Sequence, residues 1–314
     1  MAYKLHTDEQ VPDGVRRCAR EQLDRAIDAL TERVSDDPVE AVHDARKALK
    51  QERSLLRMAR GTLDPATRRS ENAALRHAAR ALSASRDAEV MLQALDELSE
   101  RYAGQAPRDT FDAIRRQLEA ERDPARQRLL ESGLPGAVAD ELRAVRTRID
   151  DWPLRRDGWK ALRPGLDRGY RGGRRAFERA RSKPTVEHLH EWRKRTKDLW
   201  YELRLLGPLS PPIVGGHADE AHALSDLLGD DHDLALLRET LLDRSGEAAV
   251  DVGPVVELID HRREQLHTEA LQVGRRLYAE RPKAFRRRMH RYWKASQDAQ
   301  KAPDAPAPVA LASL

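Results

Sequence analysis

Two short segments of the chain carry the same basic residues at the same spacing. The first reads VHDARKALK (residues 42–50) and the second reads LHEWRKRTK (residues 189–197). At 100° per residue on a helix, His43, Arg46, Lys47 and Lys50 fall in one sector roughly 120° wide, and so do His190, Arg193, Lys194 and Lys197. Arginine binds phosphate oxygens through two parallel hydrogen bonds, and lysine acts as a point charge. The pattern therefore suits an anion with several phosphate groups.

Each basic face continues along its helix. The first stripe consists of His43, Arg46, Lys47, Lys50, Arg53 and Arg57, and the second stripe of His190, Arg193, Lys194, Lys197, Tyr201 and Arg204. An ordinary solvated face mixes charge signs, because Glu and Lys four residues apart stabilise a helix by about 0.2–0.5 kcal/mol. Neither stripe contains an acid, although the chain has 53 Asp and Glu against 57 Lys and Arg. Like charges three and four residues apart repel and destabilise each of the two helices, and a bound anion would offset this repulsion.

Apolar residues recur with a helical period almost throughout, and alternation with β-branched residues is absent. This pattern predicts an all-α fold. In the first part of the chain we expect helices near 12–34, 38–60, 64–101, 108–132 and 135–150, and in the second near 157–181, 184–206, 216–244, 253–280 and 282–297. The ranges 64–101 and 216–244 leave room for a break, in the latter at Gly229. Asp37 followed by Pro38 marks one helix start, and Ser182 or Lys183 before Pro184 marks the other.

The two stripes belong to a longer internal repeat. Aligning His43 with His190 also pairs Arg46 with Arg193, Lys47 with Lys194, Lys50 with Lys197 and Arg57 with Arg204. With the offset shifted by one residue, LSASRDAEVML (residues 82–92) aligns with LGDDHDLALLR (residues 228–238). We interpret the chain as a duplication of a helical unit of about 145 residues, each unit a bundle. The expected divisions are residues 1–150, residues 151–297 and a Pro- and Ala-rich disordered tail at 298–314.

Further cations accompany the stripes in both halves. If these helices face one groove, its field is concentrated there. The candidate anion-binding residues outside the stripes are Arg16, Arg20, Arg143, Arg171, Arg174, Arg287 and Arg291. Asp87 and Asp233 occupy matched positions, and we expect them to orient an Arg or Lys rather than to contact the anion.

At these residues the sequence resembles the CHAD family, named for its histidine-containing α-helical domain. The resemblance rests on HDARKALK with SLLRMA, on HEWRKRTKDLWYELRLL, and on the matched SRDAEV and GDDHDLAL segments. It implies two four-helix bundles related by pseudo-twofold symmetry, binding of inorganic polyphosphate in a basic groove or channel, association with polyphosphate granules, and no catalysis by the domain. It would place His43, Arg46, Lys47, Lys50, His190, Arg193, Lys194 and Lys197 along the polyphosphate path, extended by Arg57, Tyr201 and Arg204.

Some positions depart from the family pattern. Relatives commonly carry Asn-Asp where this chain has His232 and Asp233, and Trp200 stands where the first half has Arg53. The two halves therefore need not bind equally. Many relatives carry an upstream triphosphatase domain, whose alternating-glutamate metal motif is absent here, so we expect a stand-alone module.

Composition limits the other function classes. The net charge is only +4, so a polyanion must meet a local concentration of cations rather than a basic chain. The single cysteine, Cys18, excludes an internal disulfide, and the sequence shows neither a signal peptide nor 18 consecutive apolar residues. We expect a cytoplasmic protein without a membrane span.

Three alternative functions stay open at this point. A nucleic-acid backbone would also satisfy the stripes, although no recognised DNA- or RNA-binding motif is present. Metal binding has poor support, because His188 and His190 lie about 200° apart on a helix and His217 and His222 are five residues apart. A polyphosphate-processing enzyme would need carboxylates holding Mg²⁺ or a P-loop, and neither pattern accompanies the stripes. We therefore expect a non-enzyme without a metal or cofactor, whose polyphosphate affinity rises as the pH falls from about 8 to 6 through His43 and His190.

Overall fold

The structure is a computed structural model, and it describes residues 3–82, 87–243 and 251–301. In the first half the helices are α1 (Val11–Asp28), α2 (Pro38–Met58), α3 (Pro65–Ala81), α4 (Asp87–Arg101), α5 (Arg108–Glu131) and α6 (Leu134–Arg148). In the second half they are α7 (Gly158–Ser182), α8 (Val186–Leu205), α9 (Gly216–Asp243), α10 (Gly253–Leu277) and α11 (Pro282–Lys301). Short helical turns extend them at η1 (Ala29–Arg33), η2 (Ala59–Gly61), η3 (Gly207–Leu209) and η4 (Pro211–Gly215). The described residues form no sheet, so the predicted all-α class is confirmed.

The starts of the two stripe-bearing helices follow from local capping. The Asp37 carboxylate accepts hydrogen bonds from the backbone N–H groups of Val39 and Glu40, each at 3.1 Å, and Pro38 occupies the first helical position. For α8 the cap is Thr185, whose hydroxyl accepts from the backbone N–H of His188 at 3.3 Å. The expected cap at Ser182 or Lys183 was therefore wrong, because Ser182 is the last residue of α7.

The two expected breaks have different outcomes. The range 64–101 divides into α3 and α4, whereas α9 runs continuously through Gly229. A Cβ atom at Gly229 would lie 3.2 Å from Arg193 Nη2, so the missing side chain lets the guanidinium of α8 rest against α9. Residues 302–314 of the predicted tail lie outside the described residues.

The hydrophobic core is shared between the two halves of the sequence. One cluster joins α1, α2, α3 and α6 to α7, α8 and α11, with Leu49 and Trp192 among its fully buried members. A second cluster joins α4 and α5 to the end of α9 and to α10, around residues such as Leu95 and Leu237. Both clusters combine residues from before and after position 150, so the division into two bundles remains a prediction from the sequence repeat.

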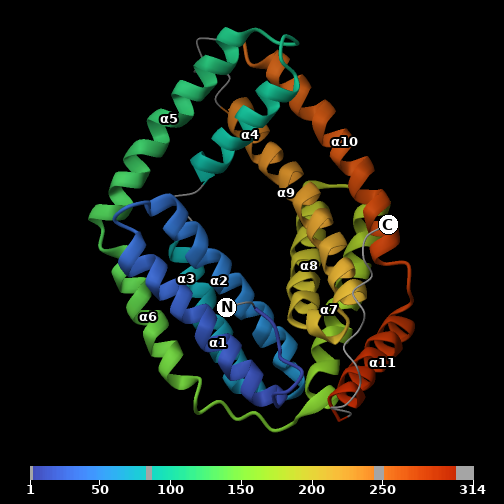
Figure 1. The fold of residues 1–314 in the computed structure, drawn as a ribbon. Coiled ribbons are helices and arrows are strands. Elements are labelled where there is room, and N and C mark those ends of the chain that lie inside the picture. The colour runs from blue at the N-terminus through green and yellow to red at the C-terminus, as the bar shows by residue number, and fades with distance from the viewer. Residues whose placement is uncertain (1–2, 83–86, 244–250, 302–314) are drawn as a thin grey trace, which may run out of the picture.

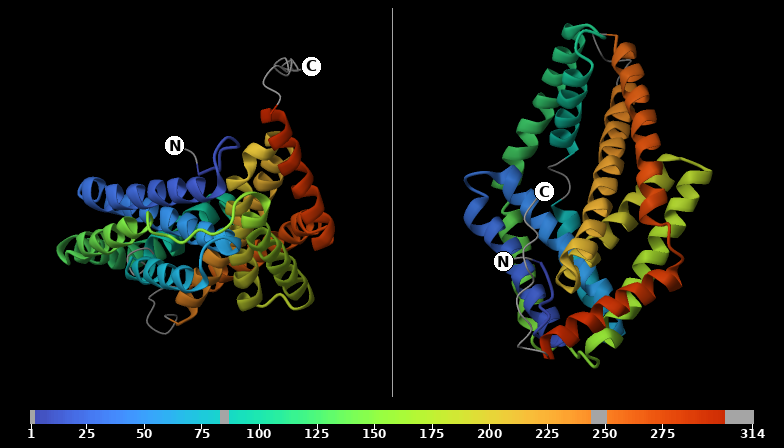
Figure 2. Two further views of the ribbon diagram at one scale, coloured as in Figure 1. Left: turned by 90° about the horizontal axis from the view of Figure 1, so that it is seen from below. Right: turned by 45° about the vertical axis from the view of Figure 1, so that its right-hand side comes forward.

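The helices form a ring-like arrangement around the middle of the molecule (Figure 1). The α4–α5 and α9–α10 pairs extend together away from the rest, as a second direction of view also shows (Figure 2). Helices α2 and α8, which carry the stripes, stand on either side of the middle of the ring in Figure 1. Among the described helices, none combines the length and the apolar character needed to cross a bilayer.

Candidate phosphate-binding faces on α2 and α8

Helices α2 and α8 meet near their C-terminal ends. The Ser54 hydroxyl donates to the backbone oxygen of Asp198 at 3.3 Å, and the Arg57 guanidinium forms an ion pair with the Asp198 carboxylate. The N-terminal segment fills the same crossing, since the Tyr3 hydroxyl donates to the backbone oxygen of Gln51 at 3.0 Å. The Tyr3 ring also packs edge-on against Tyr201 of α8, with the ring centroids 6.3 Å apart.

These contacts determine which way the stripes face. Ser54 lies at the same helical phase as the stripe on α2, and Tyr201 lies at the same phase on α8. Ser54 contacts α8 directly and Tyr201 reaches α2 through Tyr3, so the C-terminal part of each stripe lies at the crossing. Farther from the crossing, the first stripe contacts α3 through Arg53 and the second contacts α9 through Arg193. Lys50 and Lys197 lie one turn before the crossing on their helices, and Lys47 and Lys194 lie two turns before it.

The lysines keep the most accessible positive charge of the stripes. Lys47 and Lys194 are exposed, while Lys50 and Lys197 are half-buried. The Lys197 ammonium also lies 5.7 Å from the centre of the Trp200 ring, within the range of a cation–π contact. The side chains of Lys47 and Lys194 form no hydrogen bond or ion pair with any residue in the described ranges, so both are available to a ligand.

Most stripe arginines are held by the protein itself. Arg46 Nη1 donates to the backbone oxygen of Leu82 at 2.7 Å, and Arg53 Nε donates to Asn72 Oδ1 at 3.2 Å. Arg193 lies 3.9 Å from a carboxylate oxygen of Asp233. The stripes are free of acids along the sequence, but the tertiary structure brings Asp198 to one and Asp233 to the other. This finding corrects the expectation of two faces without carboxylates.

Tyr201 is not an accessible part of the second stripe. Its side chain is buried between Tyr3 and Trp200, and only 2% of the residue is exposed. Burial raises the pKa of its hydroxyl above the ordinary value. Contact of Tyr201 with a ligand stays a prediction from sequence, and the burial of its ring against Tyr3 and Trp200 argues against it. Arg204 instead lies over the Trp200 ring at 5.3 Å.

The two motif histidines have different surroundings. The His190 ring packs against His232 of α9 with centroids 4.3 Å apart. Burial, followed by His232, Lys194 and Arg193, lowers the pKa of His190 to about 4. His43 lines a hollow of about 270 Å³ between α2, α4 and α5, together with Glu89, Arg126 and apolar side chains. In the unliganded protein His190 is therefore neutral near pH 7.

The remaining candidate cations lie on α1, α6, α7 and α11. Arg16 and Arg20 of α1 are bound to the segment after α6: Arg16 donates to the backbone oxygen of Trp152 at 3.0 Å, and Arg20 pairs with Asp150. Arg143 pairs with Asp140 on its own helix at 2.6 Å. Within the described ranges, no hydrogen bond or ion pair joins any of these three arginines to a stripe residue. The other candidates lie on α7 and α11: Arg171, Arg174, Arg287 and Arg291.

Of the two aspartates expected to orient a cation, the structure describes the side chain of Asp233 and not that of Asp87. Asp233 of α9 stands beside Arg193 at 3.9 Å, which is the arrangement that such a role requires. The side chain of Asp87 lies outside the described residues. Among the clusters of side chains that the structure describes, none groups three residues suited to hold a metal ion.

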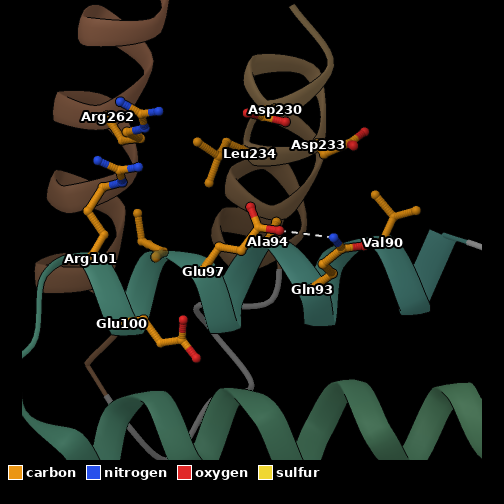
Figure 3. A pocket seen from close by; sticks show the side chains of 11 residues that line it. Val90, Gln93, Ala94, Glu97, Glu100, Arg101, Asp230, Asp233, Leu234 and Arg262 are labelled. Carbon is orange, nitrogen blue, oxygen red and sulfur yellow. Dashed lines mark hydrogen bonds between the residues drawn. The ribbon is translucent and has the colours of Figure 1, made fainter. Parts of the chain in front are cut away.

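A hollow of about 590 Å³ between α4, α9 and α10 has an acidic lining (Figure 3). Glu97, Glu100, Asp230 and Asp233 supply four carboxylates against two guanidinium groups, those of Arg101 and Arg262. Burial, followed by Glu97 and Asp233, raises the pKa of Asp230 to about 6. This hollow is unsuited to a polyanion, because its carboxylates would repel phosphate groups.

A second hollow, of about 870 Å³, lies between α7, α8 and the end of α2, and arginines dominate its lining. The candidate binding residues from sequence included Arg57, Arg171 and Arg174 but not the other five arginines of this lining: Arg60, Arg168, Arg175, Arg179 and Arg195. A signal was present in the sequence, because Arg168, Arg171, Arg175 and Arg179 recur at intervals of three and four residues. We call this hollow the arginine pocket.

The chain was compared with known protein families and solved structures. A model of the CHAD domain matches residues 17–242, which include both stripes. The chain belongs to the CHAD-domain family. This CHAD protein is also similar in fold to a solved structure, PptA from Streptomyces chartreusis, with a TM-score of 0.57 and 14% sequence identity. The match covers 91% of this chain and 100% of PptA, and at that identity it concerns the fold alone. A comparison with curated proteins gave no match.

Proposed function

We propose that this protein binds inorganic polyphosphate, without cleaving it, on the stripes of α2 and α8. Family membership indicates the ligand class, and the matched region contains both stripes. The observation that carries the proposal is the crossing of α2 and α8. Because Ser54 contacts Asp198 of α8 and Tyr3 joins Gln51 of α2 to Tyr201, the C-terminal ends of the two stripes lie next to each other. One long anion can therefore contact both stripes.

A flexible phosphate chain fits these surfaces better than a nucleic acid does. The lysines act as point charges and require no fixed orientation of the anion. Sequence-independent binding of single strands usually adds aromatic platforms on which bases stack. In the second stripe Tyr201 is buried and the ring of Trp200 is only 9% exposed, covered by Lys197 and Arg204. The stripes thus offer charge without a free aromatic surface.

The experiment is a charge reversal at matched positions of both stripes. We expect the double variant Lys50→Glu and Lys197→Glu to lose binding to long-chain polyphosphate, with its helix content by circular dichroism unchanged. The control is Lys160→Glu with Lys283→Glu, which makes the same change of charge at exposed lysines of α7 and α11. If the stripe variant binds polyphosphate as tightly as this control, the stripes are not the site.

Competition with DNA tests the alternative ligand. Wild-type protein loaded with labelled polyphosphate is challenged with single-stranded DNA at the same phosphate concentration and at about 0.15 M ionic strength. We expect DNA to displace little of the label. Displacement comparable to that by unlabelled polyphosphate would favour the nucleic-acid function.

The absence of catalysis is part of the proposal. Phosphoryl transfer generally uses carboxylates that hold Mg²⁺ beside the phosphate chain. The carboxylates that reach the stripes, Asp198 and Asp233, are engaged with Arg57 and Arg193. We expect polyphosphate incubated with the protein and Mg²⁺ to keep its length on a gel, and shortening of the chain would refute a purely binding role.

Binding of long chains also leads us to propose localisation at polyphosphate granules. A fluorescent fusion of the wild-type chain should coincide with stained granules in cells that accumulate polyphosphate. The fusion that carries Lys50→Glu and Lys197→Glu should be diffuse. A granular distribution of both fusions would mean that the stripes do not direct localisation.

A further inference from the structure

The arginine pocket contains twice as many guanidinium groups as carboxylates. Eight arginines line it, together with the acids Glu178, Glu191, Asp198 and Glu202. Glu202 is buried and Asp198 is half-buried, and burial raises the pKa of both carboxyl groups above the ordinary value. Glu202 is only 2% exposed and its Oε2 has no hydrogen-bond partner among the described residues. The lining therefore holds fewer carboxylates than guanidinium groups, and Asp198 is already paired with Arg57.

Four of the arginines are already occupied by the protein. Arg57 pairs with Asp198, Arg195 pairs with Glu191 at 2.8 Å, Arg171 pairs with Asp167 at 3.0 Å, and Arg174 donates to the backbone oxygen of Glu280 at 3.1 Å. These contacts hold the walls of the pocket in place.

The other four arginines are Arg60, Arg168, Arg175 and Arg179. Within the part of the chain that the structure describes, their guanidinium groups form no hydrogen bond and no ion pair. Arg60 Nε is buried, and burial, followed by the nearby Arg68 and Arg168, lowers the pKa of Arg60. Arg68 is affected in the same way by burial and by Arg69 and Arg168. Several cations thus lie close together without a direct ion-pair partner in the described residues.

The unpaired arginines of α7 also form a line. Arg168, Arg175 and Arg179 fall within about 40° of each other on the helix and span 11 residues, or about 16 Å along its axis. A single small anion would reach only one or two of them. A run of several linked phosphate groups would contact all three, each guanidinium binding phosphate oxygens bidentately.

We propose that the arginine pocket is a second phosphate site, which binds a run of several linked phosphate groups separately from the lysine stripes. The phosphate groups have two sources: a free short oligophosphate, or a segment of the long chain held by the stripes. The second source rests on the proposed function, whereas the first does not. Arg60 belongs to the first half and the α7 arginines to the second, so the site exists only where the two halves pack together.

The test uses tripolyphosphate as the probe and isothermal titration calorimetry as the measurement. We expect Arg168→Gln with Arg175→Gln to lower the affinity for tripolyphosphate at least about tenfold, because two charge-assisted contacts are lost. Both side chains are exposed, so neither change disturbs packing. The control is Lys160→Gln with Arg163→Gln, which removes the same charge from exposed positions on the same helix outside the pocket. Equal affinity of the pocket variant and this control would overturn the proposal.

Two further measurements separate the sources and keep the two proposals distinct. Tripolyphosphate affinity that survives Lys50→Glu with Lys197→Glu supports a pocket that works without the stripes. Affinity for long chains that falls in the pocket variant supports a pocket occupied by the long chain. Loss of tripolyphosphate binding in the stripe variant alone, with the pocket variant unaffected, would place the oligophosphate on the stripes and refute the second site. Failure of the stripe variant to affect long-chain binding would refute the proposed function and leave the pocket proposal standing.

Discussion

The salt dependence of polyphosphate binding should report directly on Lys47 and Lys194. These are the two stripe lysines with exposed side chains, and both lie two helical turns from the crossing of α2 and α8. When a cation binds a phosphate chain it releases counterions, so log K falls with log salt concentration by about 0.7 for each contact with a single strand. Replacing both lysines by glutamine should therefore reduce the slope by about 1.4.

This change of slope has a measurable size. Between about 50 and 200 mM salt, a slope smaller by 1.4 makes the fall in affinity about sevenfold smaller than in the wild type. At one salt concentration the loss of affinity should be at most about thirtyfold, from about 0.2–1 kcal/mol for each exposed charge pair. Fluorescence anisotropy with end-labelled polyphosphate at four or more salt concentrations gives both quantities.

A matched control separates local contacts from net charge. Lys160→Gln with Lys283→Gln removes two charges from exposed sites on α7 and α11. A general charge effect would reduce affinity alike in both variants, whereas the contact model reduces the slope only in the stripe variant. An unchanged slope for Lys47→Gln with Lys194→Gln would refute the inference that these lysines contact phosphate.

Three further predictions concern titration and stability. The pKa of His190 is lowered to about 4, and a bound phosphate chain would raise it again. The contribution of His190 to polyphosphate affinity should therefore grow as the pH falls from 6.5, the ordinary pKa of histidine, toward 4. Across that range the affinity of His190→Gln should depend less on pH than the affinity of the wild type. Burial, with Glu71, raises the pKa of Glu52 from 4.5 to about 8. The wild type should therefore lose about 3 kcal/mol of unfolding free energy between about pH 5 and 7, because over this range Glu52 ionises in the unfolded state alone. Urea titrations should show that Glu52→Gln removes this loss, and equal losses in both proteins would disprove the prediction. Replacing Asp198 by alanine should destabilise the fold by about 3 kcal/mol, because Arg57 loses its carboxylate partner. Thermal melts should show that the double variant Arg57→Met with Asp198→Leu regains the lost stability. If the double variant stays as unstable as Asp198→Ala, the loss comes from another contact.

The pH prediction shows how the tertiary structure changed an expectation from sequence. Sequence analysis placed the rise in affinity between about pH 8 and 6, on the assumption that both motif histidines titrate near neutrality. The ring of His232, which arrives from α9, packs on His190 and helps to lower its pKa. The window for His190 is therefore more acidic than the sequence indicated.

Helix boundaries and stripe membership were largely predictable because they depend on local order. Capping residues such as Asp37 and the apolar period act over a few neighbouring positions, so α2 begins where expected and α8 within two residues of the expected start. The family followed from the same local patterns, because the motif HDARKALK and its second copy are contiguous in sequence. The internal duplication stays a prediction of that sequence repeat.

The sequence by itself determined that this is an all-α chain with two in-phase basic stripes, because helical phase is a property of residue spacing. It also indicated a phosphate-type ligand. Only the tertiary structure decided which of those cations remain available. It buried Tyr201 in the crossing of two helices, and it brought Asp198 to Arg57 and Asp233 to Arg193 from distant positions. It also gathered Arg60 with Arg168 and Arg175 into one pocket. Charge neutralisation and burial depend on neighbours in space, and residue spacing along a single helix does not specify them.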